Sequence, residues 1–272
     1  RTGSGKTAAF LIPLFQKLVC HETTIGVRGI IMSPTRELAL QTADFVRALG
    51  RFTDIRACLL IGGDNLEDQF KDLSSNPDIV VATPGRLMHV LIETGMSLRE
   101  VQYIVFDEAD RLFEMGFAEQ MAEILKRLPE KRQTSLFTAT LPEQLLAFAK
   151  AGLREPRLVR LDADQRISPA LSLAFFTCRA SEKMAMLVYL LKWHLKSETQ
   201  QTIIFGATRY IVEYVAHVLS EVGYECDHIY GAMDAAARKI ALARFRNGRV
   251  RFLAVTDVAA RGLDVPLLDN VV

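Results

Sequence analysis

Residues 101–110 have the sequence Val101-Gln102-Tyr103-Ile104-Val105-Phe106-Asp107-Glu108-Ala109-Asp110, an apolar run that passes directly into a group of acids. The apolar run predicts a buried strand. Open α/β sheets bind their ligands at the carboxyl ends of the strands, where Asp107 and Glu108 would lie. In phosphoryl-transfer enzymes an Asp at this position holds Mg²⁺, and a neighbouring acid orients or deprotonates the attacking water. Acids also favour the first turn of a helix, so the pair alone leaves a purely structural role open.

Strands and helices alternate on both sides of this stretch. We expect further strands at residues 29–33, 56–61, 78–82 and 133–137, and one helix from the acids to about residue 127. Alternation of this kind up to about residue 161 predicts a doubly wound, mostly parallel sheet. Residues 162–172 are polar, contain Pro169 and lack periodicity, so we expect a linker there.

The same plan repeats after the linker. Strands are expected at residues 173–178, 202–205, 226–230 and 252–255, and helices at residues 182–195 and 234–246. Residues 1–161 and 173–272 are therefore predicted to form two α/β domains. The second contains no phosphate-binding Gly/Lys motif, so we expect no nucleotide of its own. Because the chain starts at Arg1 and ends in an apolar run, we expect a fragment in which both domains are truncated at their outer ends.

The composition excludes several classes of protein. The 33 Lys and Arg residues nearly balance the 32 Asp and Glu residues of this 272-residue chain, so any nucleic acid must be bound by local groups. The four cysteines form no Cys-x-x-Cys pair, which argues against a zinc site or a disulfide framework and indicates a reducing, intracellular compartment. The sequence has no apolar run of membrane-spanning length.

A glycine-rich motif opens the chain, Arg1-Thr2-Gly3-Ser4-Gly5-Lys6-Thr7. Its glycines allow a tight turn whose backbone N–H groups point at a phosphate, while Lys6 would reach the β and γ phosphates of ATP and the Thr7 hydroxyl would bind Mg²⁺. A helix expected over residues 8–19 would add the positive end of its dipole. The structural alternative is a flexible Gly/Ser turn, against which the Lys-Thr pair before an apolar helix argues.

Three further strands end in small-residue turns. The turns are Pro34-Thr35-Arg36, Gly62-Gly63 and Thr83-Pro84-Gly85-Arg86. Together they would form a surface of backbone N–H groups and arginines at one edge of the sheet. Such a surface suits a sugar–phosphate backbone and provides no obvious base readout. Taken alone, Thr35-Arg36 is equally compatible with a helix cap and a solvated Arg, and a small-residue turn such as Thr83-Pro84-Gly85-Arg86 is commonplace.

The last strand of the first domain ends in Thr138-Ala139-Thr140. Thr140 is followed three residues later by Glu143, which fits a capping box and predicts Thr140 as the N-cap of a helix. A hydroxyl that links the nucleotide site to the nucleic-acid surface is the functional interpretation. The local pattern favours the cap, and the two roles are compatible.

These motifs, in this order, closely resemble those of the DEAD-box ATP-dependent RNA helicases. They are Thr2-Gly3-Ser4-Gly5-Lys6-Thr7, Pro34-Thr35-Arg36-Glu37-Leu38-Ala39, Gly62-Gly63, Thr83-Pro84-Gly85-Arg86, Asp107-Glu108-Ala109-Asp110 and Arg261-Gly262-Leu263-Asp264. The resemblance covers essentially the whole chain. It implies two RecA-like, doubly wound parallel-sheet domains that close over ATP, Mg²⁺ and a single RNA strand.

The resemblance also implies a role for each matching residue. The catalytic residues would be Lys6, Asp107 and Glu108, with Asp107 binding Mg²⁺ through water and Glu108 acting as base toward the attacking water. ATP would contact Thr2, Gly3, Ser4, Gly5, Lys6, Thr7 and Asp264, and the metal would be held by Thr7 and Asp107. Coupling between ATP and RNA would run through Asp110, Thr138 and Thr140. RNA would contact Pro34, Thr35, Arg36, Gly63, Thr83, Gly85 and Arg86 in the first domain and Gly231, Arg238 and Thr256 in the second.

The sequence departs from the family pattern in several places. Thr138 stands where the family usually has Ser, which keeps the hydroxyl. Tyr230 replaces a His before Gly231, and Ala235 replaces a Gln, so we expect a weakened RNA contact in the second domain. The adenine-reading Q segment and the arginine-finger segment are both absent from the chain. An arginine finger accelerates phosphoryl transfer about a thousandfold or more, so we expect the chain alone to hydrolyse ATP poorly.

A finer resemblance concerns the branch of the family. Three segments resemble the nucleolar branch that assists large ribosomal subunit assembly: Glu67-Asp68-Gln69-Phe70, Arg111-Leu112-Phe113-Glu114-Met115-Gly116-Phe117 and Pro266-Leu267-Leu268-Asp269-Asn270. This resemblance implies a nuclear and nucleolar location, pre-ribosomal particles as partners, a monomeric state and no membrane association.

Two functions compete at this point. The first is an enzyme that couples ATP hydrolysis to cleft closure on single-stranded RNA and to local duplex unwinding. The second is an ATP-gated RNA clamp or assembly scaffold with little unwinding, which the departures at Tyr230 and Ala235 motivate. A DNA helicase of the wider superfamily is disfavoured by the RNA-helicase-like loops.

Overall fold

The computed structural model describes residues 5–159, 171–195, 199–260, 263, 265 and 268–272. The chain divides into two compact units, Arg1–Leu158 and Val159–Val272. Most of the linker expected at 162–172 lies outside the described residues, so the predicted domain bounds of 1–161 and 173–272 remain predictions.

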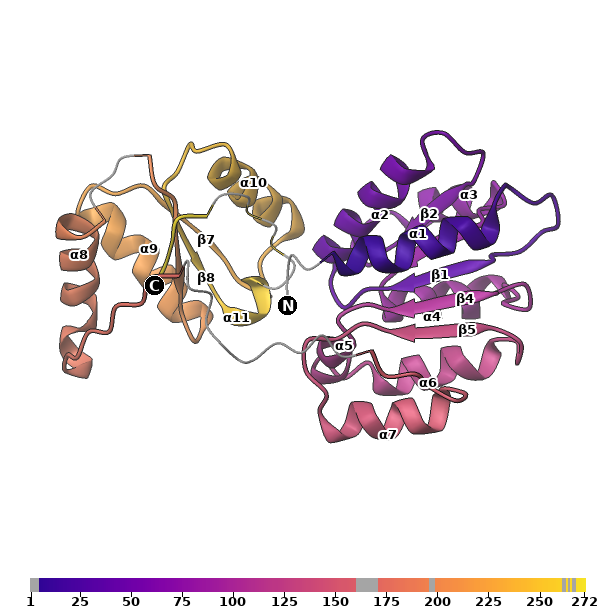
Figure 1. Ribbon diagram of the computed structural model, residues 1–272. Coiled ribbons are helices and arrows are strands. Elements are labelled where there is room, and N and C mark those ends of the chain that lie inside the picture. Colours follow the sequence, from indigo (N-terminus) through magenta and orange to yellow (C-terminus); the bar gives the residue numbers. More distant parts are fainter. Residues whose placement is uncertain (1–4, 160–170, 196–198, 261–262, 264, 266–267) are drawn as a thin grey trace. The chain divides into compact units, whose positions relative to one another are not determined.

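Unit 1 is built on a five-stranded parallel sheet in the order β2-β3-β1-β4-β5 (Figure 1). The strands are β1 Gly29–Met32, β2 Ala57–Leu60, β3 Ile79–Ala82, β4 Tyr103–Phe106 and β5 Gln133–Leu136. β1, β3 and β4 are buried at every position, as expected for parallel strands covered on both faces. The predicted doubly wound parallel sheet is confirmed.

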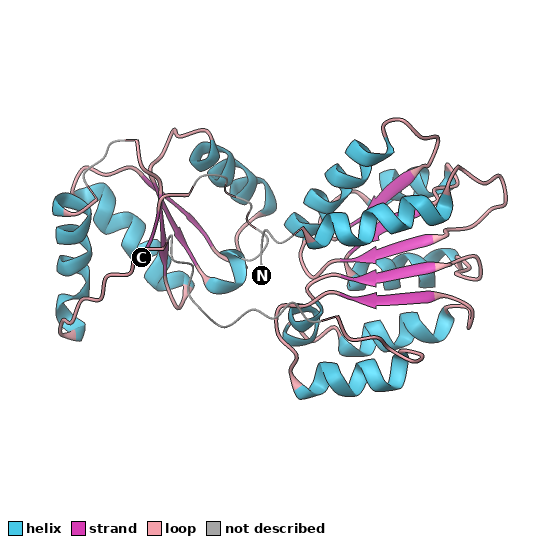
Figure 2. Cartoon of the chain, in the orientation of Figure 1, coloured by secondary structure: helices cyan, strands magenta, loops and turns pink. Residues whose placement is uncertain are grey.

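Helices cover both faces of this sheet (Figure 2). They are α1 Lys6–Leu18, α2 Arg36–Gly50, α3 Leu66–Ser74, α4 Pro84–Thr94, α5 Ala109–Glu114, α6 Ala118–Arg127 and α7 Glu143–Gly152. Successive strand residues point to opposite faces. Ile31 therefore packs in a core with α1 and α2, whereas Ile30 and Met32 pack in a second core with α4 and α6. The sheet thus lies between two layers of helices, and the connecting loops lie at the carboxyl ends of its strands.

The single helix expected up to about residue 127 is wrong, because the chain forms α5 and α6 instead. Gly116 separates them with a left-handed backbone, at φ 82°. The Gly116 N–H donates to the Phe113 carbonyl and the Phe117 N–H to the Leu112 carbonyl, both at 3.0 Å. This pair of bonds is a Schellman motif, which satisfies the last carbonyls of α5 and turns the chain.

Unit 2 contains a four-stranded parallel sheet in the order β7-β8-β6-β9. Its elements are the short 3-10 helix Ala180–Glu182, α8 Lys183–Trp193, β6 Thr202–Phe205, α9 Arg209–Glu221, β7 Cys226–Ile229, α10 Ala235–Arg246, β8 Phe252–Val255, α11 Asp257–Ala260 and β9 Asn270–Val271. α8 and α9 pack in one core cluster and α10 in the other, so this sheet also carries helices on both faces.

The strand expected at residues 173–178 is not formed. The segment is described, and within the described residues no ladder hydrogen bonds join it to either sheet. Its apolar side chains are largely exposed, with Phe175 at 89%. A segment with an apolar alternating sequence forms a strand only when its N–H and C=O groups bond to a neighbouring strand. Residues 173–178 have no such neighbour among the described residues.

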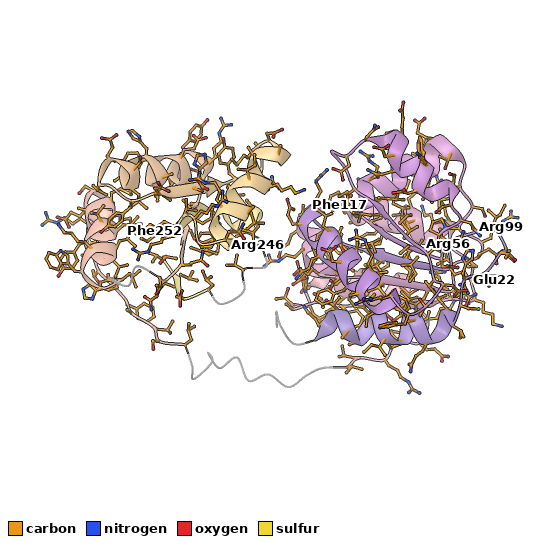
Figure 3. All side chains as sticks on the ribbon, turned by 90° about the horizontal axis from the view of Figure 1, so that it is seen from above. Glu22, Arg56, Arg99, Phe117, Arg246 and Phe252 are labelled. Carbon is orange, nitrogen blue, oxygen red and sulfur yellow. The ribbon has the colours of Figure 1, made fainter. Side chains whose placement is uncertain are left out.

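The buried charges at the amino ends of the unit 1 strands have structural partners. The Asp78 carboxylate is 2% exposed and accepts hydrogen bonds from Arg28 Nη2 at 2.6 Å and from the Arg56 N–H at 2.9 Å. The Glu22 N–H donates to the same carboxylate at 3.3 Å. Glu22 and Arg56 lie at one end of unit 1 and Phe117 at the other (Figure 3). Hydrogen bonds and an ion pair to Asp78 therefore hold this end of the sheet together.

None of the helices in the described part of the chain combines the length and apolarity needed to cross a membrane.

Candidate functional site

The predicted site residues of unit 1 gather at one edge of its sheet. They lie in the connections that follow β1, β2, β3, β4 and β5, and these strands are all parallel. The carboxyl ends of the strands therefore bring together residues 34–36, 62–63, 83–86, 107–110 and 138–140, as the sequence predicts. α1 begins in the same unit at Lys6.

The start of α1 has the geometry of an anion site. Gly5 precedes the helix with a left-handed backbone, φ 78° and ψ 15°, and the first turn contains no acidic residue. Free N–H groups and the positive end of the helix dipole therefore face outward beside the partly exposed Lys6 and Thr7. The predicted ATP contacts Thr2, Gly3 and Ser4 lie outside the described residues.

Asp107 is a buried carboxylate, 3% exposed, directly after β4. Its own N–H donates to the Met32 carbonyl at 2.9 Å, and its Oδ1 accepts from the Glu108 N–H at 3.0 Å. Burial, followed by the negative charge of Glu108, raises the pKa of Asp107 to about 6, although the Lys6 ammonium opposes the rise. The influence of Lys6 places the ammonium and the carboxylate in one electrostatic site.

Glu108 adopts a left-handed backbone, at φ 47° and ψ 52°. An L-residue other than Gly or Asn pays about 1–2 kcal/mol for this conformation. The turn ends β4 and starts α5 within two residues, and it leaves the half-buried Glu108 side chain beside Asp107. Strain of this kind at a carboxylate pair is typical of a functional turn.

The Asp107 carboxylate fits a divalent cation. Its raised pKa means that burial leaves the negative charge under-compensated, and a bound cation would supply the missing positive charge. Among the described residues, no group of three or more His, Cys, Asp or Glu side chains could hold a metal. Mg²⁺ usually takes several of its ligands from phosphates and water, so it does not require such a group.

Asp110 connects the acids to the turn after β5. Its Oδ2 accepts from Thr140 Oγ1 at 2.7 Å and from the Thr140 N–H at 3.1 Å, and its own N–H donates to Thr138 Oγ1 at 3.3 Å. Thr138 Oγ1 in turn donates to the Thr140 carbonyl at 2.6 Å. Burial raises the pKa of Asp110, but the hydrogen bonds from Thr140 and Thr138 outweigh it and hold the pKa below its ordinary value.

The capping box expected at Thr140 is wrong. α7 begins at Glu143 with Pro142 as its N-cap, and no side chain caps it. The Thr140 hydroxyl instead donates to Asp110, 30 residues earlier. A hydrogen bond to a carboxylate is stronger than one between neutral groups, so the contact with Asp110 is favoured over a local cap.

Removing the Thr140 hydroxyl should weaken this link. We expect Thr140→Val to lower the free energy of unfolding by about 1 kcal/mol at pH 7, because the bond has a charged acceptor but the threonine is exposed. The lowered pKa of Asp110 contributes stability above its ordinary pKa, and this stability is lost as the pH falls through the folded-state value. Urea unfolding should therefore show a difference from wild type that shrinks toward pH 3. Thr140→Ser is the control, and a difference that persists in acid would contradict the assignment.

Two arginines and an aspartate meet at the turn after β2. Arg36 Nη2 donates to Asp64 Oδ1 at 2.6 Å, and Arg86 Nη2 donates to the Asp64 carbonyl at 3.2 Å. Gly63 has φ +86°, and a Cβ there would lie 2.2 Å from Arg36 Nη1. The glycine is therefore required both by its backbone conformation and by the packed guanidinium.

Sequence reasoning missed the structural roles of Asp64 in this turn and of Gln69 in α3. Asp64 was not singled out, although an acid directly after Gly62-Gly63 in an otherwise basic surface was a visible signal. Gln69 is 5% exposed and uses its side-chain amide to bond both the N–H and the carbonyl of Ile61, at 3.1 and 3.0 Å. It thereby fixes the chain where it enters the turn.

The other predicted RNA contacts of unit 1 begin helices. The Thr35 hydroxyl accepts from the Leu38 N–H at 3.3 Å and caps α2, so the cap predicted as the structural alternative is present. Thr83 precedes α4 without a side-chain cap, and a Cβ on Gly85 would meet no atom within 4 Å. Pro34 is buried beside them.

The predicted residues of unit 2 also follow its parallel strands. Gly231 comes after β7, and its carbonyl accepts from Arg238 Nη2 at 2.8 Å. Thr256 follows β8, and its N–H donates to the Ile229 carbonyl at 3.2 Å. The structure therefore brings these three residues to the carboxyl edge of the second sheet. Asp264 lies outside the described residues.

Comparison with known proteins identifies the families that share these motifs. The family model described as DEAD/DEAH box helicase matches residues 1–148, and the model for the helicase conserved C-terminal domain matches residues 182–272. The chain is 57% identical over 273 residues to the putative DEAD-box ATP-dependent RNA helicase 29 of Arabidopsis thaliana, covering 100% of this chain and 32% of that protein. It is 53% identical over 272 residues to the ATP-dependent RNA helicase DDX54 of Mus musculus, covering 100% and 31%.

A solved structure supports the same fold. The Dbp5 protein of S. cerevisiae, bound to RNA and ADP BeF3, superposes with a TM-score of 0.84 at 28% identity, covering 100% of this chain and 68% of that one. The chain thus spans about a third of the length of the curated relatives that it matches.

Proposed function

The chain belongs to the DEAD/DEAH box helicase family, and from this premise we propose that it forms the core of an ATP-dependent RNA helicase. The single observation that carries the proposal is the connected set of acids after β4. Asp107 shares an electrostatic site with Lys6, and Asp110 bonds Thr138 and Thr140 in the neighbouring turn. These hydrogen bonds would let a change at the nucleotide site alter the position of the turn after β5.

ATP is proposed to bind at the start of α1. Lys6 would neutralise the β and γ phosphates, and the first N–H groups of α1 would donate to their oxygens. Mg²⁺, held by Asp107 and Thr7, would neutralise the charge that develops on the phosphates. Glu108 would accept a proton from the water that attacks the γ phosphorus, while the bond to the ADP oxygen breaks. The position of Glu108 on a strained turn beside Asp107 supports this role.

RNA is proposed to bind along the carboxyl edges of both sheets. In unit 1 the contacts would come from Pro34, Thr35, Arg36, Gly63, Thr83, Gly85 and Arg86, and in unit 2 from Gly231, Arg238 and Thr256. These groups offer N–H donors and guanidinium charge to a sugar–phosphate backbone, which gives affinity with little sequence information. Because ATP and RNA would each favour the same closed state, the binding of either would strengthen that of the other.

The biological setting is proposed from the branch resemblance. Similarity to proteins named DDX54 and DBP10 supports the same branch. We place the protein in the nucleus and nucleolus, as a monomer that acts on pre-ribosomal particles during assembly of the large ribosomal subunit. Co-sedimentation of the tagged protein with these particles, and its loss after RNase treatment, would test the assignment.

The helicase proposal is tested by two assays on the complete protein. We expect single-stranded RNA to stimulate ATP hydrolysis, and a short RNA duplex to separate only when ATP is present. Lys6→Ala should abolish both activities, because it removes the ammonium from the nucleotide site. ATP-dependent retention of RNA without strand separation would instead indicate the clamp function, and hydrolysis indifferent to RNA would contradict both.

A further inference from the structure

Asp64 is a carboxylate placed inside the proposed RNA surface of unit 1. It holds Arg36 through its side chain at 2.6 Å and Arg86 through its backbone carbonyl at 3.2 Å. The Asp64 side chain is 49% exposed and the Arg36 side chain 26% exposed. A pair this accessible contributes little to folding, so a structural role in unit 1 does not account for an acid here.

The two guanidinium groups keep donors that Asp64 does not satisfy. Nη1 of Arg36 and Nη1 of Arg86 are both buried and have no acceptor within the described part of the chain. Nη1 of Arg36 lies against Gly63, where a Cβ would come within 2.2 Å of it. Guanidinium groups bind phosphates through two parallel N–H bonds, and Asp64 gives Arg36 one carboxylate oxygen at hydrogen-bond distance. Because Nη1 of Arg36 is covered in this arrangement, a phosphate that contacts both Nη atoms requires the guanidinium to move away from Gly63 and Asp64.

We propose that Asp64 competes with the RNA phosphate for the Arg36 guanidinium, so that Arg36 must release Asp64 before it can bind the strand. This inference rests on the proposed RNA-binding function. In the RNA-free protein Asp64 holds the guanidinium at the surface and neutralises it. When RNA binds, Arg36 exchanges the carboxylate for a phosphate, and Asp64 remains as a negative charge beside the strand. The residue thus limits the affinity and favours release of the RNA.

The exchange predicts tighter RNA binding when the carboxylate is removed. We expect Asp64→Asn and Asp64→Ala to bind a short fluorescent single-stranded RNA about two- to fivefold more tightly, in the complete protein with a non-hydrolysable ATP analogue. The slope of log affinity against log salt concentration should also steepen by about 0.7. Without the carboxylate, the phosphate that binds Arg36 displaces a salt ion from the guanidinium, whereas in wild type it displaces Asp64. The exposed Asp68 of α3 is the matched control, and Asp68→Asn should leave both quantities unchanged.

A double-mutant cycle isolates the partner of Asp64. In an Arg36→Ala background, Asp64→Ala should no longer tighten binding, because the guanidinium that it competes for is gone. An equal gain in that background would show general repulsion and overturn the competition. If Asp64→Ala bound RNA more weakly while Asp64→Asn bound it like wild type, Asp64 would be a positioning residue, and the competition would be overturned. Unchanged binding by both variants would overturn it as well. A wild-type protein that binds no RNA at any salt concentration would instead overturn the proposed function, and with it this inference.

Discussion

Replacing Glu108 with Gln is expected to lower the rate of RNA-stimulated ATP hydrolysis by about a hundredfold or more. A positioned general base contributes about 10²–10⁴-fold to a reaction of this type, and Gln has the same shape but cannot accept the proton of the attacking water. The change leaves Asp107 and Lys6 in place, so the affinity for ATP should stay within about a factor of two of wild type. Single-turnover hydrolysis with the nucleotide in excess of its dissociation constant would measure the chemical step.

A second glutamate, at the other end of α5, provides the control for this experiment. Glu114, at the end of α5, pairs with the partly exposed Arg111 at 2.7 Å. Glu114→Gln removes the same charge six residues further along the chain, and we expect its hydrolysis rate to match wild type. Equal rates for Glu108→Gln and wild type would refute the role of Glu108 as base. A strong rise in the dissociation constant for ATP would point to nucleotide binding in its place.

The alternation of apolar runs with helices was enough to predict the parallel sheets and the edge at which the site residues meet. The runs that end at Met32, Ala82 and Phe106 are buried at every position, and such strands have few alternative structures. Because the carboxyl ends of parallel strands share one edge, placing the motifs after the strands also placed them together.

The errors arose where a local pattern met a distant partner. Thr140 matched a capping box, but Asp110 offered its hydroxyl a charged acceptor. Residues 173–178 matched a strand, but the described residues provide no neighbouring strand for them. Asp64 was missed because its contacts depend on the convergence of three loops and on the positive φ of Gly63, which periodicity does not report.

Asp107→Asn is expected to make the protein more stable and inactive. Burial raises the pKa of Asp107 from 3.8 to about 6 in the folded state, so the folded protein binds this proton more tightly than the unfolded chain. Stability therefore falls as the pH rises from about 4 to about 6, and the penalty stays constant above that range. A shift of about two pKa units corresponds to about 3 kcal/mol, which the neutral Asn would recover at pH 8. Hydrolysis should fall about a hundredfold or more, because Asn carries no charge with which to hold Mg²⁺.

The pH dependence separates this effect from ordinary changes in packing. In metal-free buffer, Asp107→Asn should unfold at a higher urea concentration than wild type at pH 8 and at the same concentration near pH 3, where the wild-type carboxyl is protonated in both the folded and the unfolded state. Asp110 is the matched opposite, because its pKa lies below the ordinary value, so Asp110→Asn should lose stability at pH 8. If Asp107→Asn were less stable than wild type at pH 8, groups of the folded protein itself would already balance the negative charge of the Asp107 carboxylate. The case for a metal at this position would then fail, because an under-compensated charge is the property that suits Asp107 to bind one.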